Sequence, residues 1–302
     1  MPGAHRGPSE RVGSGKCLAK CMPELPEVET IREGLRDRLV GKRLINVENL
    51  SPKQLIGDVA DAVGQTVKKI ERQGKVLILN LRESSLLFHL KMTGQLILVE
   101  NGEPELSGGH PVPKFGSEVP NKTTRIILRF SGQETLYFND LRKFGWLKVL
   151  STAEVKNEPL IKSLGPEPLS AGFTKPYLAE RSAKKSGPIK GFLLDQTIIA
   201  GIGNIYADEA LWYARIRPDR PAGSLNEAEV GRLYTATNKA IELGIKHRGT
   251  SFDSYVTIEG ERGNYLHHAK AYHQTECARC KGPIEKKKIA GRTAHFCPRC
   301  QK

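Results

Sequence analysis

Apolar side chains recur at helical spacing near the start of the chain. Four of them lie three or four residues apart, which places them on one face of a helix: Val28, Ile31, Leu35 and Leu39. Pro26 suits the first turn of such a helix, and Gly41 suits its end. The sequence therefore predicts one amphipathic helix at this point.

From about residue 43 to residue 150 the pattern changes to short runs that are rich in β-branched and aliphatic residues. Three of these runs cover residues 75–81, 124–130 and 134–138. Turn-forming residues separate them, as is typical of a β-sandwich. We therefore expect residues 22–150 to form a β-sandwich domain with a leading helix.

Helical patterns return after a stretch containing proline and glycine from Leu164 to Phe173, so we predict a linker over residues 151–170 and a helical domain over 171–270. Ser224 and Glu227 have the spacing of a capping box. The helix that follows them has one apolar face: Val230, Leu233, Tyr234 and Ile241. The expected fold class is α+β.

A glycine-containing turn over residues 200–206 separates two helical stretches, 189–196 and 207–214. Glycines let backbone N–H groups approach a ligand, and a helix N-terminus attracts phosphate. Asn204 is the natural side-chain contact for such a ligand. The alternative is that Gly201 and Gly203 only permit close helix packing.

Basic residues outnumber acidic ones. Lys and Arg total 47 and Asp and Glu total 33, which gives a formal charge of +14 over 302 residues. This charge predicts a polyanionic partner, although many basic proteins bind nucleic acid weakly and without specificity. No apolar run reaches the roughly 18 residues of a membrane-spanning helix. Residues 1–21 lack periodicity and a secretory signal, so we expect a disordered or non-native extension, no membrane partner and a cytoplasmic location.

Four of the six cysteines form two C-x-x-C pairs near the C-terminus: Cys277, Cys280, Cys297 and Cys300. Sixteen residues separate the pairs, which is the spacing of a zinc ribbon closed by two knuckles. Four thiolates leave no open coordination position, so the predicted Zn²⁺ is structural, in a module over residues 271–302. No role is expected for Cys17 and Cys21, and no organic cofactor is expected.

Five motifs occur in one order along the chain: Met22-Pro-Glu-Leu-Pro-Glu27, Gly74-Lys75, Leu164-Gly-Pro-Glu-Pro-Leu169, Gly201-Ile-Gly-Asn-Ile-Tyr206 and the terminal zinc ribbon. From Pro23 to Lys302 the chain resembles the bacterial formamidopyrimidine-DNA glycosylases. The resemblance implies a β-sandwich, a helix-two-turn-helix domain and a zinc finger, with DNA between the domains. It implies a monomeric, nucleoid-associated repair enzyme that removes oxidised purines from double-stranded DNA and cleaves the strand at abasic sites.

The resemblance also implies roles for four catalytic residues. Pro23 would be the Schiff-base nucleophile and Glu24 the neighbouring acid/base group. Lys75 would contact phosphate and assist proton transfer, and Arg292, at the tip of the zinc hairpin, would grip the phosphates around the lesion. Without the resemblance, Pro23 would be an ordinary helix-start proline, and Glu24 and Glu27 would be favourable charges in the first helical turn.

Eight further residues are expected at the DNA. Met92, Arg142 and Phe144 resemble the residues that fill the space left by a nucleotide rotated out of the duplex, and core packing is the alternative for Met92 and Phe144. Four residues are expected along the DNA backbone: Lys184, Lys185, Lys190 and Asn204. His89 is expected near Lys75. In a departure from the family pattern, a histidine-containing segment is replaced by residues 121–125, where Lys122 or Arg125 could supply the contact.

The nitrogen of Pro23 is an amide nitrogen while residues precede it, and an amide nitrogen cannot act as a nucleophile. We therefore expect translation to start at Met22, with that methionine then removed, or residues 1–21 to be cut away. Two other functions remain open from the sequence. One is an endonuclease VIII-like enzyme for oxidised pyrimidines, and the other is a non-catalytic zinc protein that binds damaged DNA.

Overall fold

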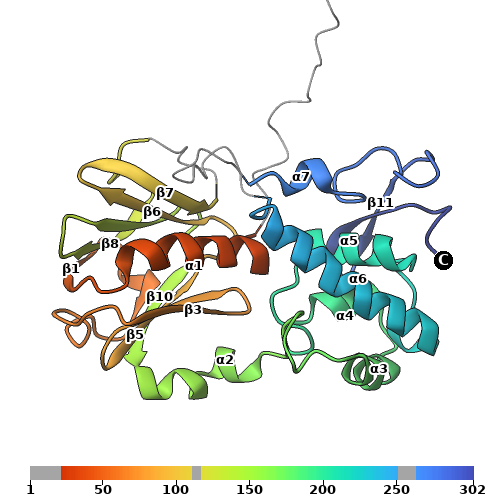
Figure 1. Ribbon diagram of the computed structural model, residues 1–302, viewed down its shortest axis with the longest axis horizontal. Helices are drawn as coiled ribbons and strands as arrows, with labels where there is room; N and C mark the ends of the chain where they lie inside the picture. Colours follow the sequence, from red (N-terminus) through yellow and green to blue (C-terminus); the bar gives the residue numbers. More distant parts are fainter. Residues whose placement is uncertain (1–21, 111–116, 251–262) are drawn as a thin grey trace, which may run out of the picture.

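The computed structural model describes residues 22–110, 117–250 and 263–302, which form two lobes side by side (Figure 1). The first lobe contains helix α1 and two β-sheets. The second contains the remaining long helices and a C-terminal β-hairpin. The predicted extension over residues 1–21, with Cys17 and Cys21, lies outside the described residues.

Helix α1 (Leu25–Leu39) confirms the first predicted element. The four predicted apolar positions are all buried: Val28, Ile31, Leu35 and Leu39. They pack into the core of the first lobe, whereas Leu25, at the start of the helix, packs into the core of the second. Gly41 follows the helix with a φ of +89°, a conformation that glycine adopts without strain. Helix α1 therefore contributes to both lobes.

Two five-stranded sheets form the β-sandwich that the sequence predicts. The first sheet has the order β1 (Leu44–Asn49), β8 (Thr124–Phe130), β9 (Thr135–Asp140), β6 (Gly94–Glu100) and β7 (Glu103–Gly109). The second has the order β2 (Leu55–Ile56), β10 (Trp146–Ser151), β5 (Ser84–His89), β4 (Val76–Asn80) and β3 (Lys69–Gln73). Only β2 and β10 pair in parallel among these strands. Side chains from both sheets, including Phe88 and Phe138, share one core, as in other aligned sandwiches.

The outer face of the second sheet is also covered. The 3₁₀ helix η3 (Thr152–Asn157) and helix α2 (Pro159–Ser163) pack there through Val155 and Ile161, while η2 (Pro52–Gln54) lies before β2. Both faces of β4 are therefore buried, which explains its continuous apolar sequence. The segment that we expected to be a linker thus contains ordered elements that belong to the first lobe.

The second lobe contains five α-helices among its described residues: α3 (Lys175–Ala183), α4 (Ile189–Leu194), α5 (Asn204–Ala214), α6 (Glu227–Lys246) and α7 (Tyr265–His268). Helices α4 and α5 flank the glycine-containing turn, as predicted. Val230, Leu233 and Ile241 of α6 are buried against α5, and Tyr234 is partly buried beside them. The helical domain predicted from the sequence is confirmed.

The predicted capping box before α6 is wrong by two residues. Asn226 is the N-cap, its side chain accepts from the amide of Glu229 (2.9 Å), and the Glu229 carboxylate accepts from the amide of Asn226 (3.0 Å). Ser224 instead lies in the 3₁₀ helix η4 (Ala222–Ser224), where its hydroxyl donates to the carbonyl of Pro221.

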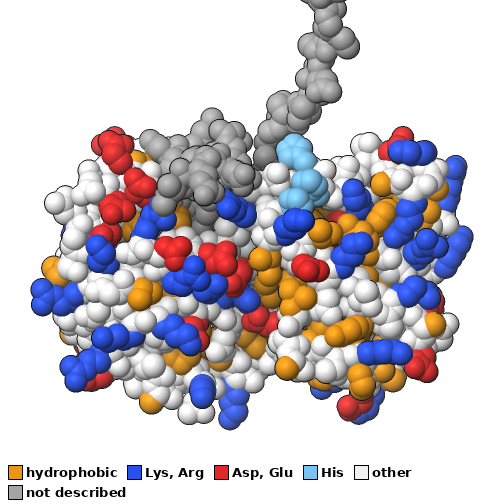
Figure 2. Space-filling model, viewed as in Figure 1, with side chains coloured by type: hydrophobic (Ala, Val, Ile, Leu, Met, Phe, Trp, Pro, Cys, Tyr) orange, Lys and Arg blue, Asp and Glu red, His pale blue; other side chains and the backbone are white. Residues whose placement is uncertain are grey.

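The chain ends in the hairpin of β11 (Glu285–Ile289) and β12 (Arg292–Phe296). Ala290 and Gly291 form its two-residue turn, both with positive φ, as in a type I′ turn. Lys and Arg side chains lie over both lobes on the face shown in Figure 2. Within the described ranges, no helix combines the length and apolar character needed to cross a membrane.

Candidate active site

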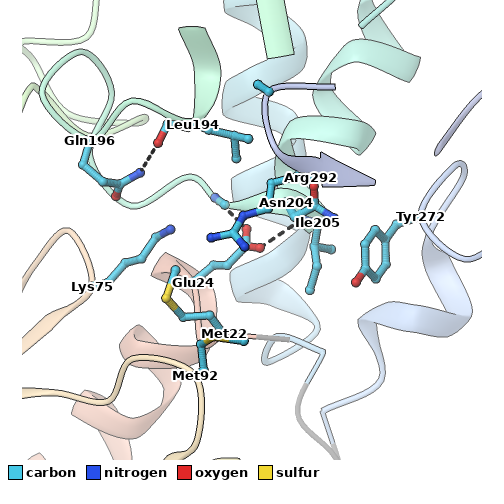
Figure 3. A pocket seen from close by; sticks show the side chains of 12 residues that line it. Met22, Glu24, Lys75, Met92, Leu194, Gln196, Asn204, Ile205, Tyr272 and Arg292 are labelled. Carbon is cyan, nitrogen blue, oxygen red and sulfur yellow. Dashed lines mark hydrogen bonds between the residues drawn. The ribbon is translucent and has the colours of Figure 1, made fainter. Parts of the chain in front are cut away.

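A cavity of about 350 Å³ lies where the two lobes meet. Glu24, Lys75 and Met92 line it from the first lobe, and Asn204 and Arg292 line it from the second. Their side chains converge from both sides in Figure 3. Five residues that the sequence assigned to catalysis or DNA binding thus share this cavity, and they come from segments far apart in the chain.

The Glu24 carboxylate is buried at the start of α5, with only 2 % of the residue exposed. It accepts hydrogen bonds from three backbone amides: Gly203 (2.8 Å), Ile205 (2.9 Å) and Tyr206 (3.4 Å). Burial raises the pKa of Glu24 to about 7, although the charge of Lys75 and the amides of α5 act in the opposite direction. A carboxyl group with this pKa can both donate and accept a proton near neutral pH.

Gly203 is required by this arrangement. A Cβ atom at this position would lie 2.3 Å from the carboxyl carbon of Glu24. The glycine in the turn therefore permits the close approach of a side chain from the other lobe. The backbone amides that we expected to face a ligand phosphate are instead bonded to a carboxylate of the protein itself.

Lys75 is also buried, and its Nζ donates to the carbonyl of Ile202 across the two lobes (2.9 Å). Burial lowers the pKa of Lys75, and the neighbouring carboxylate of Glu24 opposes this effect. His89 lies on the adjacent strand opposite Val76, close to Lys75 as expected. Burial lowers the pKa of His89 to about 3, so its ring is neutral near pH 7.

Pro23 is buried directly before Glu24, and Met22 lines the cavity. The proline nitrogen is bonded to the carbonyl carbon of Met22 in this chain. The site therefore has the predicted nucleophile next to the predicted acid/base group, with the nucleophile still in amide form.

Met92, Arg142 and Phe144 lie together although 52 residues separate the first from the last. The Nη1 atom of Arg142 lies 3.5 Å from the sulfur of Met92, and its guanidinium lies over the ring of Phe144, 4.8 Å from the ring centre. Phe144 is 53 % exposed. The core-packing alternative therefore does not describe Phe144, whose ring extends into solvent.

The residues expected along the DNA backbone occupy different environments. Lys184 and Lys185 are exposed, with Lys184 in an ion pair with Glu180. Asn204 donates to the carbonyl of Thr293 (3.1 Å). Lys190, in contrast, is fully buried. This placement differs from the expected position along the DNA backbone. The ammonium group of Lys190 is instead bonded to the carboxylate of Asp208 and the carbonyl of Thr293.

Arg292 is the first residue after the hairpin turn and is exposed at the cavity. Figure 3 shows its guanidinium next to Glu24. Because a guanidinium can bind phosphate through two parallel hydrogen bonds, this position suits a contact to DNA at the mouth of the cavity.

Sequence reasoning assigned no catalytic or DNA-binding role to Glu27, although it is part of the opening motif. Its carboxylate accepts from the amide of Glu24 (3.0 Å), the hydroxyl of Tyr206 (2.9 Å) and the amide of Thr250 (2.7 Å). Glu27 therefore joins α1 to α5 and to the segment that follows α6. Tyr272, which also lines the cavity, was missed because it belongs to no recognisable motif.

The four cysteines of the C-terminal module fit a zinc ion. Their Sγ atoms all lie within 4.8 Å of one another, and none is in a disulfide. Cys277 and Cys300 are 3.9 Å apart at sulfur, and Cys280 and Cys297 are 3.5 Å apart. Zn–S bonds of about 2.3 Å in a tetrahedron require sulfur atoms roughly 3.8 Å apart. The module is therefore a structural zinc site, as predicted.

Three family models match consecutive parts of the chain. The formamidopyrimidine-DNA glycosylase N-terminal domain matches residues 22–147, and the H2TH domain of the same family matches residues 164–255. The zinc finger found in FPG and IleRS matches residues 276–302. Together these matches cover both lobes and the hairpin.

Curated relatives are similar over nearly the whole chain. The formamidopyrimidine-DNA glycosylase of Streptococcus mutans is 39 % identical over 287 residues, which are 93 % of this chain and 100 % of the relative. The corresponding protein of Desulfitobacterium hafniense is 40 % identical over 288 residues, with the same two coverages.

Solved structures agree with the sequence matches. The complex of Lactococcus lactis Fpg with DNA containing an abasic site has a TM-score of 0.81 and 33 % identity, covering 92 % of this chain and 99 % of that chain. A complex of the wild-type Lactococcus lactis protein with DNA containing N7-benzyl-Fapy-dG has a TM-score of 0.82 and 34 % identity, covering 93 % and 100 %. The chain belongs to the formamidopyrimidine-DNA glycosylase family.

Proposed function

We propose that this chain is a base excision repair enzyme that removes 8-oxoguanine and formamidopyrimidines from double-stranded DNA and then cleaves the strand as an AP lyase. The observation that carries the proposal is the buried carboxyl of Glu24, whose pKa is about 7, directly after Pro23 in a cavity between the lobes. Family membership and the relatives bound to DNA with abasic sites or Fapy-dG support it.

The chemistry requires a free secondary amine on Pro23. Its lone pair attacks C1′ of the damaged nucleotide, the bond from C1′ to the base breaks, and the base leaves with that electron pair and a proton. Glu24 protonates O4′ of the sugar, and the ring opens to an iminium ion. Loss of a C2′ proton then expels the 3′ phosphate, and a second elimination expels the 5′ phosphate. Water finally hydrolyses the iminium ion and releases Pro23 with a free amine.

We propose that the active form begins at Pro23. The N-terminal domain model matches from residue 22, and the S. mutans relative aligns over its full length to 93 % of this chain. A terminal proline amine has a pKa of roughly 8 in the range of α-amino groups, so part of it is unprotonated near pH 7. Intact-mass measurement of the native protein tests this, and a mature chain that retains Met1 while cutting DNA would contradict it.

The remaining site residues bind DNA or assist the elimination steps. Lys75 and Arg292 contact phosphate and assist the eliminations, with His89 beside Lys75. Met92, Arg142 and Phe144 enter the space left by the flipped nucleotide, and Asn204, Lys184 and Lys185 follow the DNA backbone. We propose that the protein acts as a monomer on the bacterial nucleoid in the cytoplasm.

Borohydride trapping on a duplex with 8-oxoguanine opposite cytosine tests the proposal. Protein beginning at Pro23 is expected to become covalently attached to DNA, because borohydride reduces the iminium to a stable amine. The full 302-residue chain is the matched control and is expected to remain unattached. Trapping of the intact full chain would move the nucleophile to a lysine, and no trapping of either form would refute the catalytic proposal. A thymine glycol duplex tests the oxidised-pyrimidine alternative in parallel.

A further inference from the structure

A second group of polar side chains, two of them an ion pair, lies buried behind the cavity. It consists of Lys190 on α4, Asp208 on α5 and His295 on β12, none of them more than 3 % exposed. One carboxylate oxygen of Asp208 pairs with the ammonium of Lys190, and the other lies 2.9 Å from Nδ1 of His295. This cluster, Lys190–Asp208–His295, joins the helix-two-turn-helix pair to the zinc hairpin.

The cluster holds the backbone of β12 as well as side chains. The amide of His295 donates to Asp208 (2.9 Å). The carbonyl of Thr293 accepts from the Nζ of Lys190 (3.0 Å) and from the side-chain amide of Asn204 (3.1 Å). Thr293 directly follows Arg292, so these hydrogen bonds fix the strand one residue from the arginine at the cavity.

Attaching a hairpin through a buried ion pair carries a large desolvation penalty, because both charges lose their hydration. Apolar contacts would attach it at least as strongly, but they do not define the position of a strand along its own axis. Hydrogen bonds to the amide of His295 and the carbonyl of Thr293 do define it. The zinc site constrains the knuckles that contain Cys277, Cys280, Cys297 and Cys300, whereas the cluster constrains the strand that bears Arg292.

We propose that Asp208 and Lys190 are positioning residues that set the place of Arg292 at the cavity. The phosphate contact of Arg292, and the second elimination that it assists, then depend on a buried ion pair that does not itself touch DNA. This inference rests on the role of Arg292 in the proposed function. It replaces the expectation that Lys190 contacts the DNA backbone.

The test uses zinc-loaded protein beginning at Pro23 and the variant Asp208→Asn, which keeps the size of the side chain and removes its charge. Borohydride trapping is expected to remain within about threefold of the parent, because Pro23 and Glu24 are unaffected. The fraction of product that has undergone the second elimination is expected to fall at least fivefold. The slope of log Kd against log salt concentration is expected to decrease by about one, as for the loss of one phosphate contact.

Asp219→Asn is the matched control. Asp219 pairs with Lys287 on the other strand of the same hairpin (2.8 Å) at a partly exposed site, and this ion pair does not involve the backbone of β12, to which Asp208 is bonded. This variant is expected to retain the parental product ratio and salt slope. Lys190→Gln is the second positioning variant and is expected to change the product ratio in the same direction as Asp208→Asn. Zinc content is measured for all variants.

An unchanged product ratio and salt slope in Asp208→Asn would overturn the inference. So would a loss of trapping and second elimination in equal proportion, because that result indicates general destabilisation. A reduced salt slope in Lys190→Gln but not in Asp208→Asn would also overturn it and make Lys190 a direct DNA contact. If the parent protein itself is not trapped, the proposed function fails separately, and the salt slopes alone decide whether the cluster positions Arg292.

Discussion

The buried Glu24 site and the exposed group of Met92, Arg142 and Phe144 differ in how completely their side chains are held before DNA binds. The Glu24 carboxylate is 2 % exposed and accepts three backbone hydrogen bonds. The ring of Phe144 is 53 % exposed, and the guanidinium of Arg142 lies over it in a cation–π contact. One group is fixed by the protein, and the other extends into solvent.

The difference matches the work proposed for each group. A group that transfers protons must stand in one place when the transition state forms, so its position is set during folding. A side chain that enters the base stack finds most of its contacts on the DNA. Its exposure in the free protein costs some apolar burial and leaves the contact surface available.

The largest expected effect comes from Glu24→Gln. The amide cannot protonate the sugar, so single-turnover excision of 8-oxoguanine is expected to fall by at least about 100-fold, as for loss of a general acid. Affinity for a duplex with a non-cleavable abasic analogue is expected to change little. Glu48→Gln, at the exposed ion pair with Arg129, is the control and should leave both quantities unchanged. An equal loss of binding and chemistry in Glu24→Gln would remove the distinction between the two groups.

Zinc removal tests the contribution of the hairpin to DNA binding independently of the buried Glu24 site. Loss of the Arg292 contact is expected to weaken DNA binding by about tenfold to 100-fold, since a hydrogen bond to a charged group contributes roughly 1.5–3 kcal/mol. Trp212 packs against the zinc cysteines, so its fluorescence should change, whereas Trp146 in the sandwich should be unaffected. Zinc re-addition is expected to restore binding. Full affinity after complete zinc loss would contradict this account.

Phe144→Ala is expected to slow lesion excision from duplex DNA about tenfold, because contact with a base contributes roughly 1–3 kcal/mol. Leu169→Ala is a matched control, since Leu169 is also 53 % exposed but does not belong to the group formed by Met92, Arg142 and Phe144. The thermal midpoints of both variants should remain close to that of the parent. If both substitutions slow excision equally, exposure rather than position explains the effect.

The smallest expected effect concerns stability. The pKa of Glu24 is about 7 in the folded protein and near 4.5 when unfolded, so the folded state holds more protons between these values. This group therefore lowers the free energy of unfolding as pH rises from about 4.5 to 7, with no further change above. Urea unfolding at several pH values should show this decrease in the parent and not in Glu24→Gln. Identical pH dependence in the two proteins would show that Glu24 ionises normally.

Local patterns were sufficient for much of the fold. The spacing of Val28, Ile31, Leu35 and Leu39 predicts α1 because burial of one face is a local requirement of a surface helix. The zinc site was equally predictable from the sequence, since each knuckle is a local motif. The capping box was misplaced because Ser224 and Asn226 each precede a glutamate by three residues, and the choice depends on how η4 packs.

The placement of Lys190 could not be predicted from its own neighbourhood. It lies in a basic stretch with Lys184 and Lys185, which are exposed, and only tertiary packing brings Asp208 and Thr293 to its ammonium. The motifs identified Glu24, but its raised pKa depends on burial against a turn about 180 residues away. Long-range contacts of this kind leave no periodic signal in a single sequence.

The hydrogen bonds of Glu24 to the amides of α5 have a mechanical consequence. They cross between the lobes, as do those from the amide of Leu25 to the carbonyl of Gly201 (3.0 Å) and from Lys75 to Ile202. Any hinge motion that parts the lobes here would strip the carboxylate of its donors and admit water. A domain motion that keeps the reactive centre assembled must therefore leave these contacts between the lobes in place.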